Sequence, residues 1–322
     1  MMKFSVIIPA YNAARTIGAT LDSALAQTVI PGEILVFNDG STDETAAILE
    51  SYKPRVTVFH QTNQGPAGGR NFLCARARGD VLAFLDADDL WHPRYLEVQR
   101  KLIEAVPDAI ACFTDHENIF GMEECHWGRD MDFSSVKSEL IGPIDFIRQY
   151  DKTPLRFQMS CFCLRTSVFN QLGKEPFKVS GAEDTYLHNT LPLLGPVAHT
   201  SLRLVAYRIN EASLSSNRLR VSLLVLDVFE LLDAIYKSDA NNLLYDTFKT
   251  VHFSRMRNCG KYLMGAGRTG EARRQFRRAF KNSTSLSSSL KSLLLLFLSR
   301  LPSALGPAWP QTLRESKTSV AR

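Results

Sequence analysis

Short runs of β-branched and apolar residues alternate with longer segments of helical periodicity over the first hundred residues of the chain. The apolar runs predict buried strands at residues 5–8, 33–37, 56–60 and 81–85. The segments between them predict helices at residues 14–27, 43–51 and 66–77. Because strands joined through helices pair in parallel, the alternation predicts an α/β fold with a mostly parallel sheet flanked by helices.

Two local signals mark expected helix starts in this region. Ser41 followed by Glu44 matches a capping box, and Pro93 is typical of a first helical position. We therefore expect one helix to begin near residue 43 and another at Pro93.

The chain is less regular after residue 109. Residues 109–151 contain three glycines and many polar residues, which predicts loops with an inserted hairpin. Further strands are expected at residues 158–164 and 197–207, and further helices at residues 168–172 and 182–194. Beyond residue 217 the periodicity is helical and includes a helix pair at residues 251–263 and 270–280. The sequence thus predicts two domains, residues 1–217 with the sheet and an α-helical C-terminal region at residues 218–322.

Four polar segments lie at or directly after the predicted strands: PAYN at residues 9–12, NDGSTDET at 38–45, NQGPAGGRN at 63–71 and FLDADD at 84–89. Asp39, Asn63 and Asp86 each follow a strand. The carboxyl ends of parallel strands meet at one edge of an open sheet, and ligands bind there. The sequence therefore predicts a ligand site made of these segments.

Asp86 and Asp88 form a candidate metal site. Alternate residues of an extended segment project to the same side, so the two carboxylates can converge on one hard cation. Oxygen ligands without a thiolate favour Mn²⁺ or Mg²⁺ over zinc. The alternative is an acidic turn that caps the helix expected at Pro93, and Asp89 is expected to cap or orient the site.

Two further acids occur in GAEDTYLHNTL at residues 181–191. A carboxylate can accept the proton of an attacking hydroxyl group, which makes Asp184 a candidate general base. Acids are also favoured at a helix N-terminus by the helix dipole alone, so a purely structural role stays open. His188 shares the helix face of Asp184 and either holds that carboxylate or is structural.

In these five segments the chain resembles the family 2 glycosyltransferases of the GT-A fold, over about residues 3–215. That family transfers sugars from nucleotide-diphosphate donors with inversion. The resemblance implies a GT-A-type, Rossmann-like domain in which Asp39 binds the nucleotide, Asp86 and Asp88 bind the metal, and Asp184 is the base oriented by Glu183. It places the remaining donor-binding residues at Pro9, Ala10, Tyr11, Asn12, Gly69, Arg70, Ala87 and Arg208. For Tyr11 plain packing, and for Asp39 an ordinary turn role, are the alternatives.

The chain departs from the family pattern in two places. Asn210 stands where the family frequently has a histidine that reaches the metal or diphosphate, so water or His199 is a candidate third ligand. The GGRN of residues 68–71 replaces a more usual small residue followed by ARN, and Arg70 is expected to pair with Asp86 or phosphate. Serines at residues 213–216 suggest a mobile lid.

The expected function is transfer of a sugar from a nucleotide-diphosphate sugar to a glycan or lipid-linked acceptor in cell-surface polysaccharide biosynthesis, with Mn²⁺ or Mg²⁺ as cofactor. Two alternatives stay open. One is a nucleotidyltransferase acting on sugar phosphates, although PAYNAART lacks the Gly-rich phosphate loop of such enzymes. The other is an inactive nucleotide-sugar-binding partner protein, for which Asn210 is the encouraging feature.

The net charge of +5 is distributed unevenly. Residues 251–322 contain 14 Lys and Arg against two acids, and the other 250 residues contain 24 against 31. No nucleic-acid-binding module accompanies the basic tail, so nucleic acid is not expected as a partner. The tail is either a solvated helix face or a peripheral contact with an anionic membrane surface.

No signal peptide is visible, and no apolar run reaches the roughly 18 residues that span a bilayer. The six cysteines lack zinc-site spacing and sit in apolar contexts, which is typical of reduced core thiols. We therefore expect a cytoplasmic protein. If the tail contacts a membrane, the protein lies at the inner face of the cell membrane.

Overall fold

The computed structural model describes the chain except for residues 1, 123, 124, 126, 128–132, 134, 135, 153–156, 174, 210–216, 240, 284, 302–307 and 311–322. The chain divides into two compact units, Met1–Asn210 and Glu211–Arg322. The domain boundary expected at residue 217 stays a prediction, because residues 210–216 lie outside the described part.

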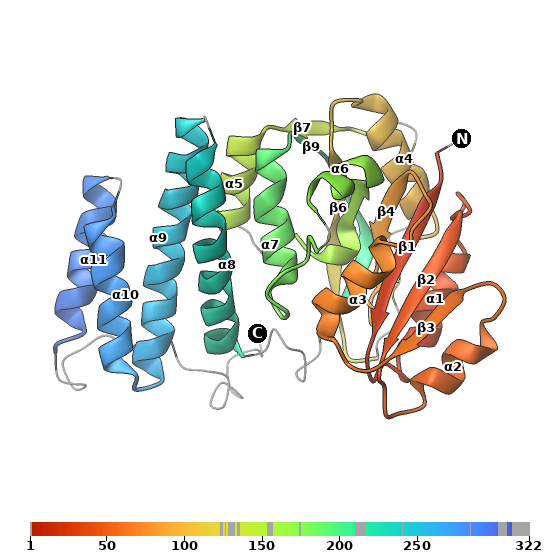
Figure 1. The fold of residues 1–322 in the computed structure, drawn as a ribbon, viewed down its shortest axis with the longest axis horizontal. Helices are drawn as coiled ribbons and strands as arrows, with labels where there is room; N and C mark the ends of the chain where they lie inside the picture. Colours follow the sequence, from red (N-terminus) through yellow and green to blue (C-terminus); the bar gives the residue numbers. More distant parts are fainter. Residues whose placement is uncertain are drawn as a thin grey trace. The chain divides into compact units, whose positions relative to one another are not determined.

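The first unit contains one mixed sheet (Figure 1). The described strands follow the order β3-β2-β1-β4-β8-β6-β9-β5, and β7 pairs with β9. They are β1 (Phe4–Ala10), β2 (Glu33–Asp39), β3 (Thr57–Gln61), β4 (Val81–Phe84), β5 (Leu90–Trp91), β6 (Ala111–Phe120), β7 (Glu139–Ile141), β8 (Phe162–Arg165) and β9 (Val197–Ile209). The first four strands of the order pair in parallel, and β8 is antiparallel to both of its neighbours.

Helices flank this sheet: α1 (Ile17–Leu25), α2 (Thr45–Ser51), α3 (Gly65–Cys74), α4 (Tyr95–Ala105), α5 (Pro143–Lys152), α6 (Thr166–Gln171) and α7 (Glu183–Thr190). The 3₁₀ turns η2 (Met159–Cys161) and η3 (Leu191–Leu193) precede β8 and follow α7. Val6, Ile8 and Phe84 are fully buried in strands β1 and β4, as expected for parallel strands covered on both faces. The predicted α/β fold is confirmed, with element ends shifted by a few residues.

The prediction of loops and a hairpin at residues 109–151 is only partly correct. The described residues between β6 and β7 are in neither helix nor strand, but β6 and β7 each pair with β9 and not with one another, and α5 follows them. β6 is a ten-residue strand between β8 and β9. The first part of β6 is apolar and buried, and pairs with β8 only as far as Phe113. Beyond Thr114 its polar residues pair with β9 alone and are less covered, which is why the strand does not read as a continuous apolar run.

The two helices begin within two residues of the predicted positions, at Thr45 and Tyr95, but the predicted start signals are wrong. The Ser41 hydroxyl accepts the Asn12 backbone N–H instead of capping α2, and Asp43 Oδ1 accepts the N–H of Thr45 at 3.0 Å. Pro93 lies two residues before α4. The strand expected at residues 158–164 begins with the 3₁₀ turn η2.

The second unit is helical: α8 (Arg218–Ser238), α9 (Asn242–Gly265), α10 (Thr269–Lys281) and α11 (Leu286–Leu298) (Figure 1). Asn217, Asn241 and Ser285 cap the starts of α8, α9 and α11 by accepting backbone N–H groups. The expected helix pair is confirmed as α9 and α10, which bury Met256, Phe276 and their neighbours in a hydrophobic cluster of this unit. Among the described residues, no helix is both long and apolar enough to cross a membrane.

Candidate functional site

The polar segments meet at one edge of the sheet, as predicted. In the parallel register Ala10 of β1 lies beside Asn38 of β2, and Ile7 of β1 lies beside Phe84 of β4. The residues that follow these positions, from Tyr11, Asp39 and Asp86 onward, therefore leave the sheet at the same edge.

Asn12 joins the first two of these segments. Its side-chain oxygen accepts the Thr42 N–H at 2.8 Å, and its own N–H is donated to Ser41 Oγ at 3.0 Å. It adopts a positive φ of 48°, a conformation that asparagine tolerates better than most residues. Pro9 and Ala10 lead into this turn, and Tyr11 beside it is 52% exposed, so its ring is available at the edge.

Asp39 lies at the end of β2 and is almost fully buried. Its Oδ1 accepts the Gln64 N–H at 2.6 Å, and its carbonyl oxygen accepts the Asn63 amide at 3.1 Å. The carboxylate therefore fixes the start of α3 against the carboxyl end of β2.

Helix α3 approaches the sheet closely through Gly69. A Cβ atom there would lie 3.0 Å from the Phe37 ring and 3.4 Å from Pro9. The glycine therefore allows α3 to pack closely against the sheet, and this packing positions the next residue, Arg70.

Arg70 is the centre of the site. It is 4% exposed, its Nη2 donates to Asp86 Oδ1 at 2.5 Å, and its Nη1 donates to Glu183 Oε1. Burial alone would lower the pKa of the guanidinium, but the charges of Asp86 and Glu183 more than offset that effect and raise it. One cation thus links the acidic turn after β4 to the start of α7.

The FLDADD segment forms a turn and not the extended run expected from sequence, because Asp89 N–H is donated to the Asp86 carbonyl at 3.1 Å. Ser160 supports it from η2: the hydroxyl accepts the Asp86 N–H at 3.0 Å and donates to Asp89 Oδ2 at 2.6 Å. Asp89 is fully buried and also accepts the Arg208 N–H. Its contacts are those of a supporting residue.

The carboxylates of Asp86 and Asp88 suit a divalent cation. Burial, together with the charge of Asp86, raises the pKa of Asp88 to about 6, so negative charge is in excess here and a cation would relieve it. The donor atoms are carboxylate oxygens, which Mn²⁺ and Mg²⁺ accept. Within the described ranges no group of three or more His, Cys, Asp or Glu forms a metal cluster, and Asn210 lies outside those ranges.

The two acids of α7 differ in their surroundings. Both oxygens of Glu183 are engaged, one by Arg70 and the other by the Gly181 N–H at 2.6 Å. Asp184 is partly exposed and accepts the Thr185 N–H through Oδ1. Burial, followed by the charge of Glu183, raises the pKa of Asp184 to about 6. A carboxylate with that pKa can accept a proton near neutral pH.

His188 does not hold Asp184. It is fully buried against the rings of Phe162 and Tyr150, with centroids 4.3 and 5.7 Å away, and neither ring nitrogen has a hydrogen-bond partner in the described part of the chain. Burial lowers its pKa to about 3, so the ring is neutral. The structural alternative is therefore the correct one.

His199 and Arg208 are already engaged by other groups. The His199 ring nitrogens face Asp115 Oδ1 at 3.0 Å and Glu139 Oε2 at 3.5 Å, which does not support a metal-ligand role. Arg208 donates to the carbonyl oxygens of Asp88, at 2.9 Å, and Gly121. Arg208 therefore braces the acidic turn, and the expected serine lid at residues 213–216 lies outside the described residues.

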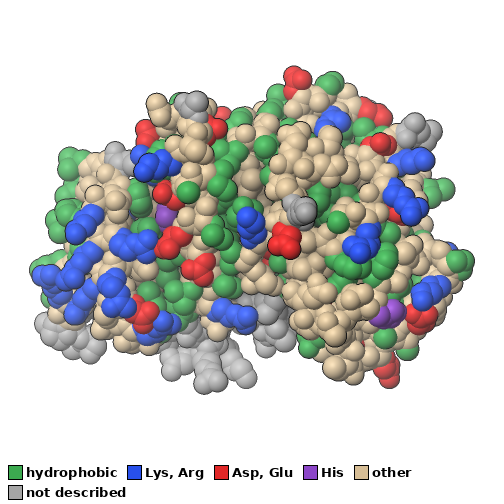
Figure 2. Space-filling model, viewed as in Figure 1, with side chains coloured by type: hydrophobic (Ala, Val, Ile, Leu, Met, Phe, Trp, Pro, Cys, Tyr) green, Lys and Arg blue, Asp and Glu red, His purple; other side chains and the backbone are tan. Residues whose placement is uncertain are grey.

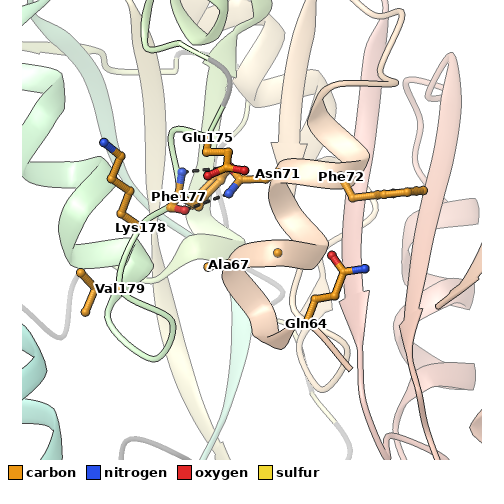
Figure 3. Close-up of a pocket in the computed structure, with 9 residues that line it drawn as sticks. Gln64, Ala67, Asn71, Phe72, Glu175, Phe177, Lys178 and Val179 are labelled. Atoms are coloured by element: carbon orange, nitrogen blue, oxygen red, sulfur yellow. Dashed lines mark hydrogen bonds between the residues drawn. The ribbon is translucent and has the colours of Figure 1, made fainter. Parts of the chain in front are cut away.

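A cavity of about 560 Å³ lies between α3 and the segment that leads into α7 (Figure 3). It is lined by Gln64, Ala67, Gly68, Asn71, Phe72, Glu175, Phe177, Lys178 and Val179. Asn71 exchanges two hydrogen bonds with the Phe177 backbone, at 2.8 and 3.0 Å. Val179 has a positive φ of 57°, which is strained for a β-branched residue and occurs four residues before Glu183.

Comparison with known proteins agrees with this architecture. The model of the family "Glycosyl transferase family 2" matches residues 5–173, just over half of the chain. The chain therefore belongs to glycosyl transferase family 2.

Individual relatives are similar over parts of the chain. The Escherichia coli protein named UDP-Glc:alpha-D-GlcNAc-diphosphoundecaprenol beta-1,3-glucosyltransferase WfgD is 41% identical over 97 residues, which are 30% of this chain and 38% of that protein. The chain spans between 15% and 38% of the length of the curated relatives it matches.

Solved structures share the fold. Residues 1–349 of TarS from S. aureus, in complex with UDP-GlcNAc, match with a TM-score of 0.65 and 18% identity, over 92% of this chain and 90% of that one. The mannosyltransferase PcManGT from Pyrobaculum calidifontis, in complex with GDP-Man and Mn²⁺, matches with a TM-score of 0.58 and 18% identity, over 92% and 80%. The fold is that of the GT-A glycosyltransferases.

Proposed function

We propose that the protein is an inverting glycosyltransferase that moves a sugar from a nucleotide-diphosphate sugar to a glycan or lipid-linked acceptor. One observation carries the proposal: Arg70 binds Asp86 and Glu183 together. The acidic turn is suited to a metal-bound diphosphate, and Asp184, the residue after Glu183, is suited to proton abstraction. The contacts of Arg70 therefore bring both into a single site.

The donor site is proposed at the sheet edge. Asp39 binds the nucleotide, with the turn at Asn12 and the exposed Tyr11 ring beside it, and Arg70 lies between the acidic segments. The full set is Pro9, Ala10, Tyr11, Asn12, Asp39, Gly69, Arg70, Asp86, Ala87 and Arg208. The complexes of TarS with UDP-GlcNAc and of PcManGT with GDP-Man support a nucleotide-sugar donor for this fold.

Asp86 and Asp88 are the proposed holders of Mn²⁺ or Mg²⁺. The bound cation supplies Lewis-acid stabilisation of the departing diphosphate. The Mn²⁺ in the PcManGT complex supports this cofactor, and the excess of carboxylates around Arg70 gives a physical reason for it.

Asp184 is the proposed general base. The acceptor hydroxyl oxygen attacks the anomeric carbon while its proton passes to the Asp184 carboxylate, and the bond from that carbon to the diphosphate oxygen breaks. Attack from the face opposite the leaving group inverts the anomeric configuration. Glu183, held by Arg70 and the Gly181 N–H, orients the start of α7 for this step.

The acceptor is proposed to be a glycan or a lipid-linked glycan of cell-surface polysaccharide biosynthesis. The name of WfgD, whose acceptor is a diphosphoundecaprenol-linked sugar, supports this class. Such acceptors sit at a membrane, so we place the protein in the cytoplasm at the inner face of the cell membrane.

A two-stage assay tests the proposal. Thermal shift with a panel of nucleotide-sugars, each with Mn²⁺, Mg²⁺ or a chelator, should identify one donor that stabilises the protein only when a cation is present. Turnover of that donor should then release nucleoside diphosphate and glycosylate the acceptor. Release of pyrophosphate would instead indicate a nucleotidyltransferase, and binding without turnover an inactive partner protein.

A further inference from the structure

Helix α11 presents five of its apolar side chains to solvent, although Leu295 and Leu296 pack against the hydrophobic cluster of its unit. Ser288, Ser292 and Ser299 next to its end are 8%, 0% and 2% exposed. The exposed positions are Leu286 at 77%, Leu290 at 57%, Leu293 at 49%, Leu294 at 56% and Phe297 at 61%. A surface helix in a water-soluble protein normally turns polar side chains to solvent, so this exposed apolar face is unusual.

The buried serines hold α11 to its unit through polar contacts. Arg257 of α9 donates to Ser288 Oγ at 2.8 Å, and Arg273 of α10 donates to the Ser299 carbonyl at 2.7 Å. Ser292 donates to the Ser288 carbonyl within the helix. These contacts and the packing of Leu295 and Leu296 lie on one side of α11, so the five exposed apolar side chains are on the other.

The five exposed apolar residues form one continuous surface. At about 100° per residue they fall within an arc of about 100° on the helix, centred opposite the buried serines. We call this surface the α11 apolar stripe: Leu286, Leu290, Leu293, Leu294 and Phe297.

Positive charge surrounds the stripe within its unit. Between Ala272 and Pro310 the sequence has seven Lys and Arg and no Asp or Glu. Figure 2 shows Lys and Arg side chains gathered, with hydrophobic ones among them, on the part of the molecule that holds the C-terminal helices. Six of these cations are exposed on or next to α10 and α11: Arg274, Arg277, Arg278, Lys281, Lys291 and Arg300. Arg278 pairs with Glu230 of α8 at 2.8 Å.

We propose that the α11 apolar stripe binds the surface of an anionic phospholipid bilayer. The leucines and Phe297 enter the boundary between headgroups and acyl chains, and the surrounding cations attract the lipid phosphates. The stripe can leave water only by contact with another surface. A second copy of the chain would bring two sets of positive charges together, which opposes such pairing. The charge complementarity therefore selects the anionic membrane as the occupant.

Vesicle co-sedimentation of the full chain tests the proposal. Wild type should sediment with vesicles of equal parts phosphatidylglycerol and phosphatidylcholine, and not with phosphatidylcholine alone. Leu290→Gln with Leu294→Gln should weaken partitioning by about tenfold or more, since two buried leucines are lost from the contact. Because both side chains are exposed, the melting temperature should stay within error of wild type.

Leu243→Gln is the matched control, since Leu243 is 58% exposed on α9 outside the stripe, and it should bind as wild type does. Equal binding by wild type and the double variant, or no binding by wild type, would overturn the proposal. The proposal would also be overturned if light scattering showed that wild type is a dimer and that the double variant is a monomer. The proposed transferase activity on a soluble acceptor is measured separately in the same variants, so the two proposals fail independently.

Discussion

At the scale of single residues, Arg70 organises the charges of the site. It is surrounded by four carboxylates, those of Asp86, Asp88, Glu183 and Asp184, whose charges all act on it or on one another. Burial, and after it the charge of a neighbouring carboxylate, raises the pKa values of Asp88 and Asp184, and the single guanidinium of Arg70 does not cancel the effect. The site is therefore built to receive a further cation.

Arg70→Lys should disconnect the two acidic segments. An ammonium group keeps the charge but cannot make the paired contacts to Asp86 and Glu183, so we expect a stability loss of about 1–3 kcal/mol and a larger fall in kcat than rise in donor KM. Urea unfolding and steady-state kinetics measure both. Arg76→Lys, an exposed arginine just beyond α3, is the control, and an equal effect from both variants would argue against a bridging role.

The activity should fall in acid because Asp184 must be unprotonated to act as base. Its pKa of about 6 means that the base is available above that pH and is lost as the pH drops below it. We expect kcat at saturating metal and donor to be constant above about pH 7 and to fall about tenfold per unit well below pH 6. A kcat profile that stays flat down to pH 5 would exclude Asp184 as the base.

The sequence predicts the site residues that directly follow a strand. Asp39 and Asp86 are predicted at one edge because parallel strands end together, and Asp86 is one of the two partners predicted for Arg70. The roles of Ser160 in η2 and Asn71 in α3 were missed, because a serine or asparagine gives no local sign of which distant group it will bind. The anchoring of Glu183 by Arg70 depends on a contact 113 residues apart in sequence.

At the scale of elements, the first half of the sheet was predictable and the second half was not. Strands β1 to β4 alternate with helices along the chain, so local pattern defines them. β6 finds its partners β8 and β9 about fifty or more residues later, and polar residues occupy its second half. Its identity is thus set by tertiary pairing, which local periodicity does not encode.

The α9 and α10 pair depends on a close approach at Gly260. A Cβ atom there would lie 2.4 Å from the ring of Phe276, which is fully buried. We expect Gly260→Ala to destabilise the protein by about 1–3 kcal/mol in urea unfolding, despite the better helix propensity of alanine. Gly270→Ala in α10 is the control, since nothing lies within 4 Å of its would-be Cβ, and it should be neutral or slightly stabilising. Equal effects would remove the packing explanation.

At the scale of the whole molecule, the sequence already separated an acidic body from a basic tail. The acidic part contains the candidate site and also α8, and the basic part, from residue 251, contains most of α9, α10 and the α11 apolar stripe. Hydrophobic clusters lie within each unit. The units divide at residues 210–211, whereas the charge composition changes only at residue 251, inside α9.

Residues 1–217 should therefore fold when expressed alone. The large cluster around β1, β4 and β6 contains residues of the first unit throughout, and a core of that size is sufficient for a domain. We expect one cooperative unfolding transition and retained nucleotide-sugar binding by calorimetry. A fragment that shows no cooperative transition would mean that the C-terminal helices are required for folding.

The central claim is that the site transfers a sugar with Asp184 as the base, and Asp184→Asn tests it most directly. Donor binding in the presence of Mn²⁺ should be unchanged, because Asp39, Asp86 and Asp88 are intact. Release of nucleoside diphosphate in the presence of acceptor should fall by about 10²–10⁴-fold, as expected when a general base is lost. Near-normal turnover by Asp184→Asn would contradict the account.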